Sequence, residues 1–148
     1  MDKKDLSKLI DEIFIPFGFK RKGNYWTFNG EVLSKMINLQ KSDFGNFFYV
    51  NYGYIIRKLE LGNNTMHIYN RFGSIDTNEN KRITELLDLE NSIVENDRLT
   101  ELKGFLSNKL VPKIQTVNTE EDLLNELKRR PHLNDIPLIV KKYFNLMD

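Results

Sequence analysis

Cysteine is absent from the 148 residues, and so is alanine. Without cysteine the chain can form no disulfide, supply no thiol nucleophile and bind no metal through thiolates. This absence fits a reducing compartment, so we expect a cytoplasmic protein. The lack of alanine, together with many Asn, Lys and Ile residues, is typical of an AT-rich genome and indicates a bacterial source.

Histidine is scarce, and the common catalytic motifs are missing. The two histidines, His67 and His132, have no second ligand at metal-binding spacing, and no Walker loop, G-x-S-x-G or G-x-G-x-x-G pattern occurs. Ser42 with His67 as its base is the one nucleophilic pair that can be drawn, and a single serine with a single histidine is a weak signal. The sequence therefore predicts neither a metal nor a cofactor, and it favours a protein that is not an enzyme.

Long apolar runs and a strong net charge are also missing. No apolar run approaches the roughly 20 residues of a membrane-spanning helix, and the start, MDKKDLSKLIDEIF, has no signal-peptide core. The formal net charge of +1 argues against a nucleic acid as partner. What the chain does contain is 40% hydrophobic residues, including 10 Phe and 6 Tyr, with no linker or repeat. We expect one soluble domain over residues 1–148.

Hydrophobic spacing predicts an α+β fold. Apolar residues at helical spacing predict a helix over residues 5–17, which Pro16 and Gly18 end. Short turns favour an antiparallel meander of four strands, at 25–28, 32–41, 47–57 and 66–72. Later segments predict a short helix or turn at 84–89 and helices at 97–114, 119–130 and from Asp135 to Met147. The expected architecture is an N-terminal helix, a four-stranded antiparallel meander sheet, and C-terminal helices packed on one face.

Two of the predicted strands contain amides, which strands usually disfavour, within the stretch INLQKSDFGNFFYVNYG (residues 37–53). We expect these amides on a polar face formed by three facing pairs: Asn38 with Asn51, Gln40 with Tyr49, and Ser42 with Phe47. The opposite face then collects the apolar residues Leu33, Ile37, Leu39, Phe48, Val50, Tyr52 and Ile56. A slip of one residue would mix the two sets, so the pattern predicts this register.

The same alternation in the last predicted strand adds three residues to the polar face. The complete candidate surface is Asn38, Gln40, Ser42, Tyr49, Asn51, His67, Tyr69 and Arg71, with Tyr25 or Trp26 at its border. One interpretation is a solvated sheet face, which antiparallel sheets commonly have. The other is a recognition surface, because amides offer adaptable hydrogen bonds and tyrosines offer rigid contact area.

A basic segment precedes the tryptophan: Lys20, Arg21 and Lys22, then Trp26. Such a segment is typical of a solvated turn. It is also the pattern of a phosphate or RNA contact that has a ring for stacking. On this second interpretation the basic turn and its ring meet His67 and Arg71 in one pocket.

Three segments together resemble a known family. They are GFKRKGNYW (residues 18–26), INLQKS (37–42) and GNFFYVNYG (45–53). In this arrangement they are similar to the bacterial family called domain of unknown function 4304, over the first half of the chain to about Arg71. The resemblance implies a small cytoplasmic bacterial protein and supplies no established activity or catalytic residue.

Three functions stay open at this point. The first is a non-enzymatic protein-binding module of immunity or accessory type, which would bind a protein partner through the polar sheet face; the immunity role is an analogy with other small α+β families. The second is a phosphate-ligand or RNA-binding domain, or an enzyme, that uses the basic turn with His67 and Arg71. The third is a homodimer with a structural role.

Overall fold

The computed structural model describes residues 1–146 and begins with a capped helix. Helix α1 (Lys3–Phe14) starts earlier than its apolar spacing predicts, because Asp2 caps it. The Asp2 carboxylate accepts a hydrogen bond from the N–H of Asp5, and the Asp5 carboxylate accepts one from the N–H of Asp2. The short 3₁₀ turn η1 (Ile15–Phe17) then ends at Gly18, whose φ of +93° is a conformation that glycine adopts readily.

The sheet has five antiparallel strands in chain order, one more than the sequence predicts. The strands are β1 (Lys20–Lys22), β2 (Tyr25–Asn29), β3 (Leu33–Lys41), β4 (Phe48–Ile56) and β5 (Ile68–Arg71). The additional strand, β1, is the segment interpreted above as a basic turn. Its three basic residues have no apolar alternation that would predict a strand, and it forms by pairing with β2, with Arg21 opposite Trp26.

The predicted register of the central hairpin is confirmed. Asn38 lies opposite Asn51 and Gln40 opposite Tyr49, and the N–H of Ser42 donates to the carbonyl oxygen of Phe47 over 2.8 Å. The two faces are therefore sorted as the alternation predicts. The apolar face is covered by helices and is called the inner face below; the opposite one is called the outer face.

The second half of the chain is helical, as predicted, with different boundaries. Its elements are α2 (Thr77–Leu87), α3 (Glu95–Phe105), a π-helical segment η2 (Leu106–Leu110), α4 (Val111–Gln115), α5 (Glu120–Lys128) and α6 (Leu138–Tyr143). The short helix or turn expected at 84–89 is the end of α2, which Asp76 caps by accepting from the N–H of Glu79. The predicted position Met147 lies outside the described residues. Within residues 1–146, none of the helices has the length and apolar character needed to cross a bilayer.

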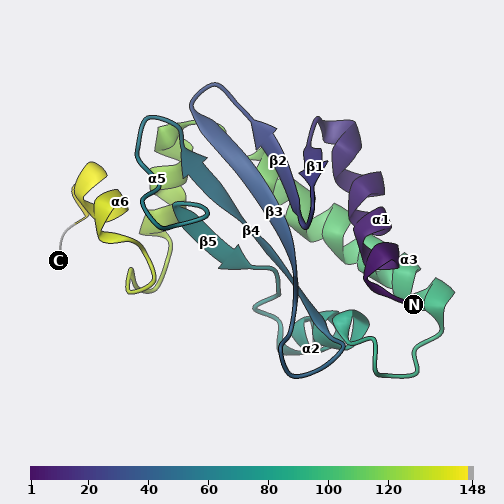
Figure 1. The fold of residues 1–148 in the computed structure, drawn as a ribbon. Coiled ribbons are helices and arrows are strands. Elements are labelled where there is room, and N and C mark those ends of the chain that lie inside the picture. The colour runs from purple at the N-terminus through teal and green to yellow at the C-terminus, as the bar shows by residue number, and fades with distance from the viewer. Residues whose placement is uncertain (147–148) are drawn as a thin grey trace.

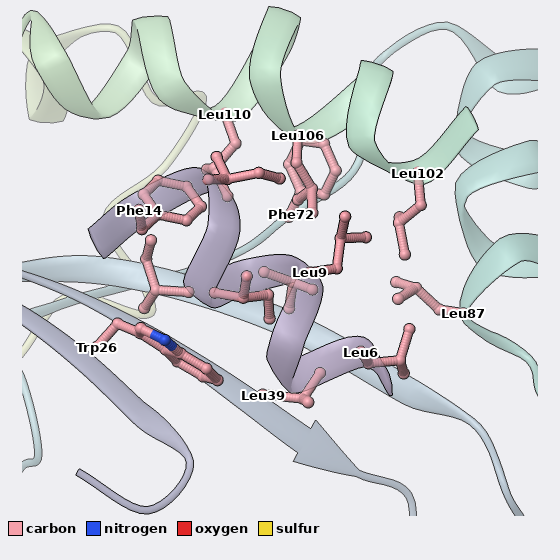
Figure 2. Close-up of a cluster of buried hydrophobic side chains, with 14 of the residues drawn as sticks. Leu6, Leu9, Phe14, Trp26, Leu39, Phe72, Leu87, Leu102, Leu106 and Leu110 are labelled. Carbon is pink, nitrogen blue, oxygen red and sulfur yellow. The ribbon is translucent and has the colours of Figure 1, made fainter. Parts of the chain in front are cut away.

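The main core lies between the sheet, α1 and the continuous helix that α3, η2 and α4 form. Figure 2 shows side chains of α1, such as Leu9 and Phe14, lying between the sheet residues Trp26 and Leu39 and the row Leu102, Leu106 and Leu110. A second core joins the ends of the central strands to α5 and α6 through residues such as Tyr54, Leu123 and Val140. Figure 1 shows that helices α1 and α6 lie on opposite sides of the molecule.

Helix α2 is fixed against α3 by a buried arginine. Arg98 is 2% exposed, and its guanidinium donates to the carbonyl oxygens of Glu85, Leu86 and Asp88 at the C-terminal end of α2. A cation is favoured there because the helix dipole is negative at that end. The hairpin loop between β3 and β4 also contacts this end, since the N–H of Leu89 donates to the carbonyl oxygen of Asn46 over 3.0 Å.

Candidate binding surface

The outer face presents ordered rows of side chains across all five strands. One row, read from strand to strand, is Lys22, Tyr25, Asn38, Asn51 and Arg71. The next row is Lys20, Thr27, Met36, Gly53 and Tyr69. Lysines therefore stand at the β1 edge of this face, and Tyr69 and Arg71 stand at the β5 edge.

Asn51 lies at the centre of this face and is completely buried. Its amide nitrogen donates to Oδ1 of Asn38 over 3.0 Å and to Oε1 of Gln40 over 2.9 Å. Its Oδ1 accepts from Nε of Arg71 over 3.4 Å. A buried amide needs such partners because an unsatisfied polar group is costly. The expectation of a solvent-facing Asn51 is therefore wrong: it is a structural amide beneath the surface.

Gln40 connects Asn51 to the exposed residues above it. Its Oε1 also accepts from the hydroxyl of Tyr69 over 3.4 Å and from Nη2 of Arg71 over 3.3 Å. Burial raises the pKa of the Tyr69 hydroxyl, with Arg71 opposing the shift, so the hydroxyl is a donor at neutral pH. Gln40, Tyr69 and Arg71 all remain exposed.

Besides its hydrogen bonds to Asn51 and Gln40, Arg71 contacts an aromatic ring. Its Cζ lies 3.7 Å from the ring centroid of Tyr49, within the range of a cation–π contact. Tyr49 in turn meets Phe47 edge to face, with ring centroids 6.0 Å apart. We call the connected residues the amide–arginine cluster: Asn38, Gln40, Tyr49, Asn51, Tyr69 and Arg71.

Gly53 explains why β4 and β5 approach so closely beside the cluster. A Cβ at this position would lie 1.8 Å from the carbonyl oxygen of Ile68 and 2.4 Å from the sulfur of Met66. Any side chain would therefore collide with backbone. Met66 fills this space and is 4% exposed. The alternation predicted for residues 66–72 would place Met66 on the apolar face, but β5 begins only at Ile68, so the alternation does not extend to Met66.

His67 is also placed differently from the prediction. It is 1% exposed, its Nδ1 accepts from the N–H of Ile56 over 2.8 Å, and its Nε2 lies 2.8 Å from the carbonyl oxygen of Glu60. Because a backbone N–H only donates and a carbonyl only accepts, the ring is neutral with its proton on Nε2. His67 thus holds the loop between β4 and β5 and is not part of the exposed surface.

The Ser42–His67 pairing considered from the sequence does not exist. Ser42 is buried in the β3–β4 turn, where its Oγ accepts from the N–H of Phe44 over 3.1 Å. His67 lies at the other end of β4, beside Ile56. At about 3.4 Å per residue, the length of β4 separates the two side chains by roughly 25–30 Å.

The basic segment does not gather around Trp26 as an open stacking site. Trp26 is completely buried, and its Nε1 donates to Oδ1 of Asp11 over 2.8 Å. Arg21 lies on the same side, 3.1 Å from Oδ2 of Asp11, while Lys20 and Lys22 alternate to the outer face. The prediction that these residues meet His67 and Arg71 in one pocket is therefore wrong, because Trp26 and His67 are both structural.

Two hollows flank the amide–arginine cluster. The first, of about 660 Å³, is lined by residues that include Tyr25, Asn38, Gln40, Asn64, Met66 and Tyr69. The second, of about 710 Å³, lies between β5, the start of β4 and α2, and Tyr49 and Arg71 form part of its wall. Sequence reasoning missed the second hollow, because its lining comes from segments that only the tertiary fold brings together. Among residues 1–146, no three His, Asp or Glu side chains gather as metal ligands.

Comparison with known proteins identifies the family. A family model described as Domain of unknown function (DUF4304) matches residues 10–116, and the chain belongs to this family. The match includes all five strands and the whole amide–arginine cluster. It confirms the resemblance carried by the three segments described above. No curated protein and no solved structure matches the sequence.

Proposed function

We propose that this member of the DUF4304 family is a non-enzymatic protein-binding module, of immunity or accessory type, in the bacterial cytoplasm. Its contact surface is the outer sheet face around the amide–arginine cluster. The observation that carries the proposal is the arrangement of this cluster. Asn51 is fully buried at the base of the cluster, while Gln40, Tyr69 and Arg71 are exposed at the surface of the outer face.

The cluster suits binding because its side chains are held in place before a partner arrives. Binding normally costs free energy to immobilise flexible side chains, and prior hydrogen bonding reduces that cost. Gln40 Oε1 accepts from three donors, and Arg71 is held by both amide oxygens and the Tyr49 ring. Tyrosine and arginine are also the residue types that contribute most binding energy in protein interfaces.

The alternative functions have less support. A phosphate or RNA site built on the basic segment would need Trp26 and His67, and both are buried in structural hydrogen bonds. A homodimer through the outer face uses the same surface, with a second copy as the partner. Light scattering at micromolar concentration distinguishes that case, because a dimer mediated by this face disappears in a variant that removes it.

The proposal is tested by affinity capture with a face variant. The triple variant Gln40→Ala, Tyr69→Ala, Arg71→Ala removes the exposed part of the cluster and retains the buried Asn51. A matched triple variant, Glu121→Ala, Asn125→Ala, Lys128→Ala, changes three exposed residues of α5. Both proteins and the wild type are tagged, compared by circular dichroism, and used at low salt to capture partners from the native cell extract.

Each outcome of the capture bears on the proposal. The proposal is supported if the wild type and the α5 variant both retain one protein in stoichiometric amount and the face variant loses it. Equal retention by all three proteins places the contact elsewhere and overturns the proposed surface. A nucleotide or RNA recovered in place of a protein overturns the protein-binding role.

A further inference from the structure

The hollow beside α2, called the α2 hollow below, has an apolar floor. Phe48, Phe72, Ile83 and Leu87 line it and are buried, so the floor is continuous with the main core. Its volume of about 710 Å³ is in the range of sites that accept a large side chain or a small ligand. The hollow is thus large enough for an aromatic or branched apolar group.

The rim of the α2 hollow presents an apolar side chain to solvent. Ile75 is 107% exposed, although hydrogen bonds on both sides hold its backbone. The N–H of Ser74 donates to Oδ1 of Asn80 over 3.1 Å, and the N–H of Asp76 donates to Oγ of Ser74 over 3.1 Å. Large apolar side chains held in water beside an apolar hollow are typical of protein contact sites.

The charge of the sheet adds a second requirement for the partner, beside an apolar group that fits the α2 hollow. The five strands contain six basic residues and no Asp or Glu: Lys20, Arg21, Lys22, Lys35, Lys41 and Arg71. The chain as a whole has a formal net charge of only +1, so acids are concentrated in other segments. Three of these cations, Lys20, Lys22 and Arg71, stand on the outer face. A partner that approaches this face therefore meets positive charge, and complementary charge favours its association.

Arg71 joins these two features. It lines the α2 hollow and belongs to the amide–arginine cluster. Its hydrogen bonds go to the neutral amide oxygens of Gln40 and Asn51, and within residues 1–146 it forms no ion pair. The guanidinium is therefore oriented and uncompensated, which is the state in which a carboxylate gains most from a charge-assisted bond.

One acid and one further cation lie around the α2 hollow. Asp88 lines it, and its Oδ1 accepts from the N–H of Glu90 over 3.0 Å. Lys113 lines the hollow as well and is exposed. Counting Arg71 and Lys113 against Asp88, the lining of the hollow is net positive.

We propose that the partner presents an acidic segment with one large apolar side chain, which enters the α2 hollow while a neighbouring carboxylate binds Arg71. This inference rests on the proposed function, since it names the chemistry of the partner for the same face. Like charges across an interface are strongly unfavourable, so a basic segment would be rejected. The exposed Ile75 at the rim offers a further apolar contact to the protein that carries this segment.

The direct test uses labelled peptides as probes. Fluorescence anisotropy is measured for three nine-residue peptides, with central Phe and flanking Glu, with central Ala and flanking Glu, and with central Phe and flanking Lys. We expect the peptide with central Phe and flanking Glu, called the Glu–Phe peptide, to have a Kd at least about tenfold lower than either of the others. Its affinity should fall as salt rises from low to high concentration, because salt screens exposed charges.

Two variants locate the binding. Thr84→Trp places an indole in the α2 hollow from an exposed position of α2, and its matched control, Asn78→Trp, changes an exposed position of the same helix that does not line the hollow. We expect Thr84→Trp to abolish the preference for Phe over Ala, and Asn78→Trp to preserve it. Arg71→Gln should abolish the preference for Glu over Lys.

The results separate failure of this inference from failure of the proposed function. Equal binding of the three peptides overturns the inference, and the proposed function then stands or falls on the captured partner alone. A preference for Glu–Phe that Thr84→Trp does not change also overturns the assigned hollow. An oligouridine that displaces the bound peptide would replace the acidic segment with RNA, and this result contradicts both proposals.

Discussion

The guanidinium of Arg71 lies over the ring of Tyr49, with Cζ 3.7 Å from the ring centroid. The two residues are diagonal neighbours on adjacent antiparallel strands, since Arg71 stands opposite Asn51. Such diagonal pairs are within reach of long and aromatic side chains. The contact holds the guanidinium at the boundary between the amide–arginine cluster and the α2 hollow.

Replacing Arg71 by Lys tests how much this contact contributes. The ammonium group keeps the charge and loses both the planar stacking and the fork of donors. We expect a loss of about 0.5–1 kcal/mol in the free energy of unfolding, as for an exposed cation–π contact. Urea unfolding measures it. A loss of several kcal/mol would mean that Arg71 supports the core, and it would remove Arg71 from the binding surface.

Asn51 and Gln40 should respond very differently to replacement by Ala. Asn51→Ala removes a buried amide that donates to two neighbours, so we expect a loss of about 1–3 kcal/mol. Gln40→Ala removes an exposed side chain, and water can replace its oxygen as acceptor for Asn51, so the loss should stay below about 1 kcal/mol. Urea unfolding of the two variants side by side gives the comparison. Equal losses would show that the cluster stabilises the fold as a unit.

His67→Phe should weaken the loop between β4 and β5. The variant leaves the buried N–H of Ile56 without an acceptor, at a cost of about 1–3 kcal/mol. Hydrogen exchange at the Ile56 amide should accelerate together with this loss. The matched control, His132→Phe, changes an exposed histidine and should alter stability by less than about 0.5 kcal/mol. Unchanged exchange at Ile56 would contradict the assigned hydrogen bond.

Trp26 provides an optical test of its burial. It is the one tryptophan of the chain and is completely buried, so acrylamide should quench its fluorescence poorly until urea unfolds the protein. Added oligouridine should leave the emission unchanged, because no ring face is available for stacking. Strong acrylamide quenching of the folded protein would contradict the burial of Trp26. A change of emission on adding oligouridine would restore the basic segment as a nucleic-acid contact.

Glu101 should contribute to the pH dependence of stability. The hydrogen-bonded guanidinium of Arg82 holds the pKa of this carboxyl below its usual value. A folded pKa below the unfolded one, which is about 4.3, means that the stabilisation is present above that pH and is lost as pH falls through the folded value. The urea midpoint of the wild type should therefore drop more between pH 7 and pH 3 than that of Glu101→Gln. The control Glu121→Gln should follow the wild type.

The sequence predicts the central hairpin well because each residue there is sorted by a repeat of two. Asn38, Gln40 and Asn51 cannot change faces without exposing Ile37, Leu39 or Val50, so the pattern allows one register. The same reasoning cannot tell which polar residues are covered. Asn51 is buried by its own neighbours on the face, and alternation carries no information about that.

The predictions from sequence are wrong where the regular alternation of side chains along a strand ends. Met66 and His67 precede β5, so their side chains follow loop geometry instead of strand alternation. β1 is an edge strand of three basic residues, which carry no apolar signal. The N-terminal part of α2, TNENKR, is entirely polar, and the Asp76 cap is the local feature that indicates its start.

The collision that any side chain would meet at Gly53 has a practical consequence for protein engineering. A combinatorial library over the outer face has to keep positions 51 and 53 constant, because one is buried and the other has no space. The exposed positions 40, 69 and 71 can be randomised on the same rigid strands. The domain is thus a cysteine-free scaffold from which new binding specificities can be selected.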